Sequence, residues 1–261
     1  MRRIEVNNFM LLLCILNALQ ANAVIIIGHR GAAGYAPENT LSAFSQAIEC
    51  DVDMIECDVR RCASGELVVF HDAQLDRITD GTGDVAAHTL HELQQFKVLG
   101  NERIVTLMQM LDVIEHKVKV YIELKDLDIA IDVLCIIDHY VTHCGWSYND
   151  FLIASFDHVQ LRDIKAMRDT ITTIALMYGI PIGFAACATE INADIVALDS
   201  EFITHQFVDD IHNRGMLVYV YTVNQQKDLM RLMNYGIDGI ITDVPCHVRD
   251  WLKFLFVSLQ N

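Results

Sequence analysis

The sequence is poor in proline and in positive charge. Three prolines stand among 261 residues, and no stretch rich in serine, glycine or like charges divides the chain, so we expect one compact domain. Nineteen lysines and arginines face 35 aspartates and glutamates, for a formal net charge of −16. Because nucleic-acid backbones are bound through stripes of Lys and Arg, this balance argues against a nucleic-acid partner. An anionic small molecule stays compatible where a metal ion or local cations neutralise it.

The cysteines lack the spacing of a disulfide framework. None of the eight forms a CxxC pair, and all but Cys14 lie beyond residue 23. We therefore expect them to be small core residues or free thiols.

The first 23 residues differ from the rest. A basic start (MRR), an apolar run (FMLLLCILNAL) and an A-x-A site (ANA, 21–23) are typical of a signal peptide, and the run is short for a permanent membrane helix. We predict a signal peptide over 1–23, a single mature domain over 24–261 without a stable membrane span, and export to the periplasm or beyond. The alternative is a helix retained on a cytoplasmic protein, since cleavage would bring seven cysteines, an odd number, into an oxidising compartment.

Apolar runs alternate with helical periodicity along the chain. The runs centre near residues 25, 56, 121, 153, 175, 196, 219 and 240, and most precede an amphipathic stretch. Eight such units predict an α/β fold of the (β/α)₈, or TIM, barrel type. A doubly wound open sheet is the alternative, but GHRG at 28–31 is not a G-x-G-x-x-G turn.

Two local features refine this prediction. GELVVFHD at 65–72 is a ninth strand that pairs locally, and the turn-rich segment over about 73–105 is a small insertion after the second strand. Asn39 is the expected N-cap of the first helix, and Gly215 the expected C′ residue of a later one.

Polar side chains follow several predicted strands at the point where each ends. Side chains two apart on a strand share a face, so Glu56 and Asp58 point one way while Cys57 points the other. Because strand ends converge on one rim of a barrel, we expect three carboxylates, two imidazoles and two cations to meet there: Glu56, Asp58, Glu123, His29, His71, Arg30 and Lys125.

This combination is typical of phosphodiester cleavage. Clustered carboxylates repel one another unless they hold a hard divalent cation such as Mg²⁺ or Ca²⁺. Such a cation attracts phosphate oxygens, and Arg30 and Lys125 can neutralise the remaining charge. Two histidines beside a phosphate suit proton removal from a nucleophile and protonation of a leaving oxygen.

Ordinary ion pairs are the alternative for these charges, Glu56 or Asp58 with Arg60 or Arg61, and Arg30 with Glu38. The third carboxylate, Glu123, comes from a different strand and favours the metal site. Asp72 either orients His71 or caps the following turn.

Over residues 25 to about 250, the sequence resembles the glycerophosphodiester phosphodiesterase family. The resemblance rests on HRGAAGYAPENTLSAF, DMIECDVRRCASGELVVFHDAQLDRITDGTG, IELK, VYTVN and GIDGIITDVP, in that order. It implies a TIM barrel with a small insertion, and metal-dependent hydrolysis of glycerophosphodiesters to sn-glycerol 3-phosphate and an alcohol. It further implies metal ligands at Glu56, Asp58 and Glu123, acid–base histidines at His29 and His71, phosphate-binding cations at Arg30 and Lys125, and aromatic walls at Phe156 and Tyr221.

Two other functions compete with this one. Related barrels cleave lysophospholipids or other lipid phosphodiesters, and the apolar loop YGIPIGFAACATEI, 178–191, is long enough to meet an acyl chain. A binding module without catalysis is the other alternative, which the complete set of acidic residues and histidines disfavours.

Overall fold

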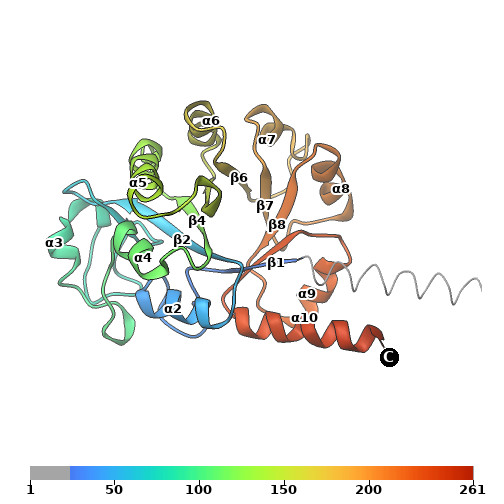
Figure 1. The fold of residues 1–261 in the computed structure, drawn as a ribbon, viewed down its shortest axis with the longest axis horizontal. Helices are drawn as coiled ribbons and strands as arrows, with labels where there is room; N and C mark the ends of the chain where they lie inside the picture. Colours follow the sequence, from blue (N-terminus) through green and yellow to red (C-terminus); the bar gives the residue numbers. More distant parts are fainter. Residues whose placement is uncertain (1–23, 261) are drawn as a thin grey trace, which may run out of the picture.

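The computed structural model describes residues 24–260 (Figure 1), with side chains to residue 255. The predicted signal peptide, 1–23, lies outside the described residues. Eight strands form the barrel: β1 (Ile25–Gly28), β2 (Met54–Arg61), β4 (Lys119–Leu124), β5 (Phe151–Ser155), β6 (Thr172–Met177), β7 (Ile195–Asp199), β8 (Leu217–Tyr221) and β9 (Gly239–Thr242). Every neighbouring pair is parallel, and β1 pairs with both β9 and β2. The sheet is therefore closed, which confirms the barrel and excludes the doubly wound alternative.

Helices cover the outside of the barrel (Figure 1). They are α2 (Leu41–Glu49), α4 (Leu107–Ile114), α5 (Ala130–His143), α6 (His158–Met167), α7 (Ala186–Glu190), α8 (His205–Asn213), α9 (Gln226–Met233) and α10 (Pro245–Gln260), with a short η3 (Tyr148–Asp150) before β5. Within residues 24–260, no helix has the length and apolar character that crossing a membrane requires.

Two apolar layers hold the barrel together. The larger lies between strands and helices and includes Cys57, whereas a smaller cluster fills the barrel interior and includes Tyr121 and Ile241. The strand alternation predicted around Cys57 therefore holds: Cys57 faces the helices, and its neighbours face the barrel axis.

A smaller unit sits beside the barrel between β2 and α4. Strand β3 (Leu67–Val69) pairs antiparallel with the end of β2, as expected for the ninth strand. The chain then passes through η1 (Val85–Ala87), α3 (Leu90–Leu93) and η2 (Leu99–Asn101), at the left of Figure 1. This unit has an apolar cluster of its own: Cys62, Val68, Phe70, Leu75, Ile78, Val85, Leu93, Val98 and Ile104.

The turn from β1 into α2 corrects one prediction. Thr40, not Asn39, is the N-cap of α2, since its hydroxyl accepts a hydrogen bond from the Ala43 amide. Asn39 instead adopts φ 58°. Gly31, at φ 88°, lets the turn pack on α2, because a Cβ there would lie 2.6 Å from the Ala43 backbone. At the end of α8, Gly215 takes the left-handed C′ position as expected.

A disulfide corrects a second prediction. Cys50, just after α2, is bonded to Cys246 in the first turn of α10, 196 residues away. Only barrel closure brings the two together, so local spacing carried no signal of the bond. Within residues 24–260, five further cysteines are free, namely Cys57, Cys62, Cys135, Cys144 and Cys187.

Removing this bond should destabilise the fold. We expect Cys50→Ser with Cys246→Ser to lower the free energy of unfolding by about 2–4 kcal/mol, because the bond closes a long loop of the unfolded chain. Guanidinium unfolding without reductant measures the change, and Cys135→Ser, at an exposed free thiol, is the matched control. Equal stability of the double variant and the wild type would contradict the bond.

Candidate active site

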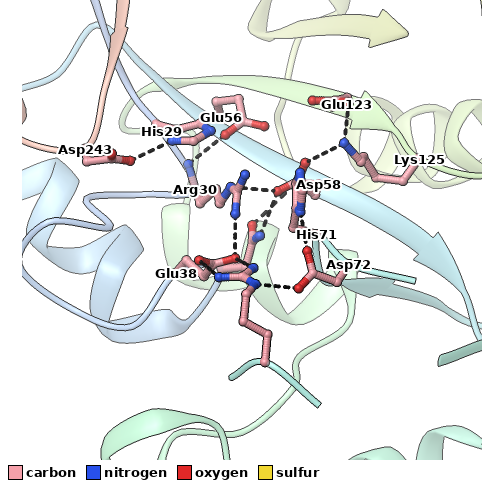
Figure 2. Close-up of polar contacts among 12 residues, drawn as sticks. His29, Arg30, Glu38, Glu56, Asp58, His71, Asp72, Glu123, Lys125 and Asp243 are labelled. Atoms are coloured by element: carbon pink, nitrogen blue, oxygen red, sulfur yellow. Dashed lines mark hydrogen bonds and ion pairs between the residues drawn. The ribbon is translucent and has the colours of Figure 1, made fainter. Parts of the chain in front are cut away.

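Three carboxylates from two adjacent strands meet at the rim of the barrel (Figure 2). Asp58 of β2 lies opposite Glu123 of β4 in the sheet register, and Glu56 lies one inward-facing position below Asp58. Their carboxylate oxygens come within 4.8 Å of one another. These are hard oxygen donors at the spacing of a shared ion, so the residues present fit Mg²⁺ or Ca²⁺.

Burial makes this cluster electrostatically demanding. Glu56 and Asp58 are 3% and 1% exposed. Burial, reinforced by the charge of Asp58, raises the pKa of Glu56 to about 8, and the same two causes raise the pKa of Glu123. Burial also acts on Asp58, but Arg30 and Lys125 hold the pKa of this carboxyl below its usual value. A bound cation would relieve the repulsion that these shifts express.

Two basic side chains flank the carboxylates. Lys125 Nζ lies 2.7 Å from Glu123 and 3.6 Å from Asp58. Arg30 Nε lies 3.4 Å from Asp58, and is a buried polar atom without a hydrogen bond to any described residue. Both side chains are thus placed to meet an anion beside the carboxylates.

The alternative ion pairs are only partly present. Arg60 and Arg61 pair with Asp126 and Asp132, so neither neutralises Glu56 or Asp58. The expected pair of Arg30 with Glu38 does form, at 2.6 Å, in addition to the contact with Asp58.

Each histidine of the site is held by an aspartate. His29 Nδ1 lies 2.6 Å from Asp243, which follows β9, and His71 Nδ1 lies 2.6 Å from Asp72 (Figure 2). Such contacts on Nδ1 leave Nε2 of each imidazole for proton transfer. Asp72 therefore orients His71, which decides between its two expected roles. Asp243 was missed, although its place after the last strand puts it on the same rim.

The two imidazoles differ in basicity. Burial lowers the pKa of His71 below its ordinary value. Burial acts the same way on His29, but the hydrogen bond to Asp243 and the charge of Glu56 together raise its pKa.

A chain of ion pairs joins His71 to Arg30. Arg77, from the segment after β3, donates to Asp72 and, at 2.6 and 2.9 Å, to both oxygens of Glu38. Glu38 in turn accepts from Arg30. Arg77 and Glu38 were not among the predicted site residues. Together they brace a histidine and a cation that stand on different loops.

Asn39, the residue after Glu38, holds Asp58 of the acidic cluster through two hydrogen bonds. Its amide donates to Asp58 at 2.8 Å and its carbonyl oxygen accepts from the Asp58 amide. The left-handed backbone at residue 39 is what turns the side chain inward.

The predicted aromatic residues line a small cavity next to the carboxylates, formed by His29, Glu56, Tyr121, Glu123, Phe156, Leu176, Tyr221 and Ile241. Phe156 is 51% exposed at its mouth. The Tyr221 hydroxyl donates a hydrogen bond to the Met177 carbonyl oxygen at 2.9 Å, so its proton is not available to a ligand in the cavity.

Comparisons with known proteins agree with this geometry. The sequence model of the glycerophosphoryl diester phosphodiesterase family matches residues 29–247. A glycerophosphodiester phosphodiesterase of Caldanaerobacter subterraneus subsp. tengcongensis is 32% identical over 234 residues, which is 85% of this chain and 94% of that protein. A Bacillus subtilis protein of the same name is 27% identical over 88% of this chain and 86% of its own length. The structure of an Oleispira antarctica phosphodiesterase in complex with the product sn-glycerol-3-phosphate superposes with a TM-score of 0.81 at 27% identity, covering 88% of this chain and 96% of that one.

The pair of His29 with Asp243 predicts a pH-dependent contribution to stability. Because the pKa of His29 is raised in the folded protein, the stabilisation is fully present below the pKa of an unfolded histidine, near 6.5, and is lost as pH rises through the folded value. We therefore expect Asp243→Asn to lower the free energy of unfolding more at pH 6 than at pH 9. Urea unfolding of both proteins, each in chelator, measures this. An equal loss at both pH values would be incompatible with a charged pair.

Proposed function

This chain belongs to the glycerophosphoryl diester phosphodiesterase family and is a phosphodiesterase, and on that premise we propose that it hydrolyses glycerophosphodiesters such as glycerophosphocholine or glycerophosphoethanolamine. The products are sn-glycerol 3-phosphate and the free alcohol. The observation that carries the proposal is the meeting of three carboxylates, two aspartate-held histidines and two cations around one point.

In this proposal Glu56, Asp58 and Glu123 hold one divalent cation, Mg²⁺ or Ca²⁺. When bound, the cation supplies positive charge to the phosphate oxygens. Arg30 and Lys125 contact the same phosphate, and their contacts with Asp58 and Glu123 keep them in place. These residues bind and orient the diester without taking part in proton transfer.

The histidines carry the protons. One imidazole accepts a proton from the attacking water as the water oxygen forms the new P–O bond. The other, protonated, gives its proton to the alcohol oxygen as the old P–O bond breaks, so that charge and protons balance. Asp243 and Asp72 hold the rings in position for this exchange, which contributes typically 10²–10⁴-fold to the rate.

A second candidate function is favoured by the apolar surface next to the cavity. In the segment between β6 and α7, Tyr178, Ile180 and Ile182 are 70%, 46% and 105% exposed, which would suit the acyl chain of a lysophospholipid. Assays of glycerophosphocholine and lysophosphatidylcholine side by side separate the two. A strong preference for the lysolipid would replace our first proposal with this one.

We also propose that the protein is exported and that residues 1–23 are its signal peptide. The disulfide between Cys50 and Cys246 supports this, since such bonds persist mainly in oxidising compartments. Fractionation of cells that make the full chain, with mass spectrometry of its N-terminus, tests it. An uncleaved cytoplasmic protein would contradict export.

The proposed activity predicts a metal requirement. We expect the wild type to release sn-glycerol 3-phosphate from glycerophosphocholine, to lose this activity in chelator, and to regain it with Mg²⁺ or Ca²⁺. Glu56→Gln and His29→Ala should each reduce turnover by about 10²-fold or more, because one loses a cation ligand and the other a proton carrier.

Glu49→Gln, at an exposed carboxylate of α2, is the matched control and should be as active as the wild type. Full turnover in chelator, or in either site variant, would refute the roles assigned here.

A further inference from the structure

The cavity beside the carboxylates contains a hydroxyl without a partner. Tyr121 lies in β4, two residues before Glu123 and opposite Glu56 in the register with β2. The residue is 1% exposed and belongs to the cluster inside the barrel. Tyr121 lines the cavity, and its hydroxyl forms no hydrogen bond with any described side chain or backbone atom. Among the described residues, Arg30 Nε is the fully buried side-chain polar atom that lacks a partner, so the unpaired hydroxyl of Tyr121 is not sealed off from solvent.

Other tyrosines of the chain show the contrast. The hydroxyls of Tyr140, Tyr148 and Tyr221 all donate to protein oxygens at 2.6–2.9 Å. Tyr219 of β8 shares the lack of a partner, but it does not line the cavity. Tyr121 is thus the buried tyrosine whose free hydroxyl is available to a ligand beside the carboxylates.

The cavity lies on one side of the phosphate-binding groups. His29, Glu56 and Glu123 line it, whereas Arg30, His71 and Lys125 do not. Figure 2 shows His29 with Glu56 on one side of Arg30, and His71 with Asp72 on the other. A diester whose phosphate meets Arg30 and Lys125 therefore places one of its two alcohol groups in the cavity and the other toward His71, whose side chain is 31% exposed.

The walls indicate which alcohol enters. Phe156, Leu176 and Ile241 present carbon surface, and Tyr221 has already committed its proton. Beyond the titratable acidic and imidazole groups, the Tyr121 hydroxyl is therefore the lining group with a free hydrogen-bond donor. A glyceryl group carries hydroxyls that need such a partner and is compact enough for this space. It is also the half common to all glycerophosphodiesters, which suits the enclosed side, while the variable alcohol suits the exposed side near His71.

We infer that Tyr121 is a specificity-determining residue whose hydroxyl hydrogen-bonds a free hydroxyl of the substrate's glyceryl group in this cavity. The inference rests on the proposed function and deepens it, because it assigns recognition of the glyceryl half to a particular residue of β4.

Binding of product analogues tests the inference without turnover. Calorimetry of the Ca²⁺-loaded protein compares sn-glycerol 3-phosphate with n-propyl phosphate, which has the same three carbons but no hydroxyls. Tyr121→Phe should weaken binding of sn-glycerol 3-phosphate by about threefold to tenfold, the range of one hydrogen bond, and leave binding of n-propyl phosphate unchanged. Because the removed hydroxyl has no partner in the protein, the Tm of the variant should not fall.

Tyr219→Phe is the matched control, since it removes a buried tyrosine hydroxyl from the same barrel but outside the cavity, and it should change neither affinity. Equal affinities of Tyr121→Phe and the wild type for both ligands, or an equal loss for both, would overturn the inference. So would tighter binding of phosphocholine than of sn-glycerol 3-phosphate to the wild type, because the aromatic walls would then hold the cationic alcohol.

A different result would refute the proposed function itself. A wild type that releases no sn-glycerol 3-phosphate from glycerophosphocholine would refute the activity, whereas an active enzyme with unchanged binding in Tyr121→Phe would refute only the role of Tyr121.

Discussion

The structure depends on the concentration of negative charge at the barrel rim. Glu56, Asp58 and Glu123 bring their oxygens within 4.8 Å of one another, and two of the three residues are almost fully buried. An unneutralised buried charge costs several kcal/mol, so a scaffold that tolerates three must be stable elsewhere and must place opposite charge nearby. The closed sheet supplies the stability, since its parallel ladders hold the backbone of both acidic strands. Arg30 and Lys125 supply the opposite charge.

The two histidines that complete the site are held in different ways. His29 stands at the end of β1 but takes its orientation from Asp243 after β9, so barrel closure between these two strands sets the position of its ring. The disulfide links the helices that follow the same two strands, and so holds the seam on which His29 depends. The orientation of His71 does not depend on barrel closure. It depends on Asp72, which is itself held by Arg77 from the segment beside the barrel.

Sequence periodicity was enough to predict the barrel and the face of each acidic side chain, because both follow from alternation within single strands. The missed features all depend on segments far apart in the chain. Asp243 and the disulfide bond acquire meaning only after barrel closure, and Arg77 only once the segment after β3 packs against the turn that holds Glu38. The N-cap was misplaced by one residue for a different reason: Asn and Thr both cap helices, but the site needs a left-handed residue first, and Asn tolerates φ 58° where β-branched Thr does not.

Formal charge explains how an acidic protein can bind an anionic substrate. With all three carboxylates ionised, they exceed Arg30 and Lys125 by one negative charge. Without a divalent cation, protonation of Glu56, whose pKa is raised to about 8, relieves this excess. With the cation, the centre carries one net positive charge, which a phosphodiester anion neutralises. A phosphate monoester carries nearly two negative charges at neutral pH, so hydrolysis leaves the centre over-neutralised. The same charge balance that favours substrate binding therefore also favours release of the product.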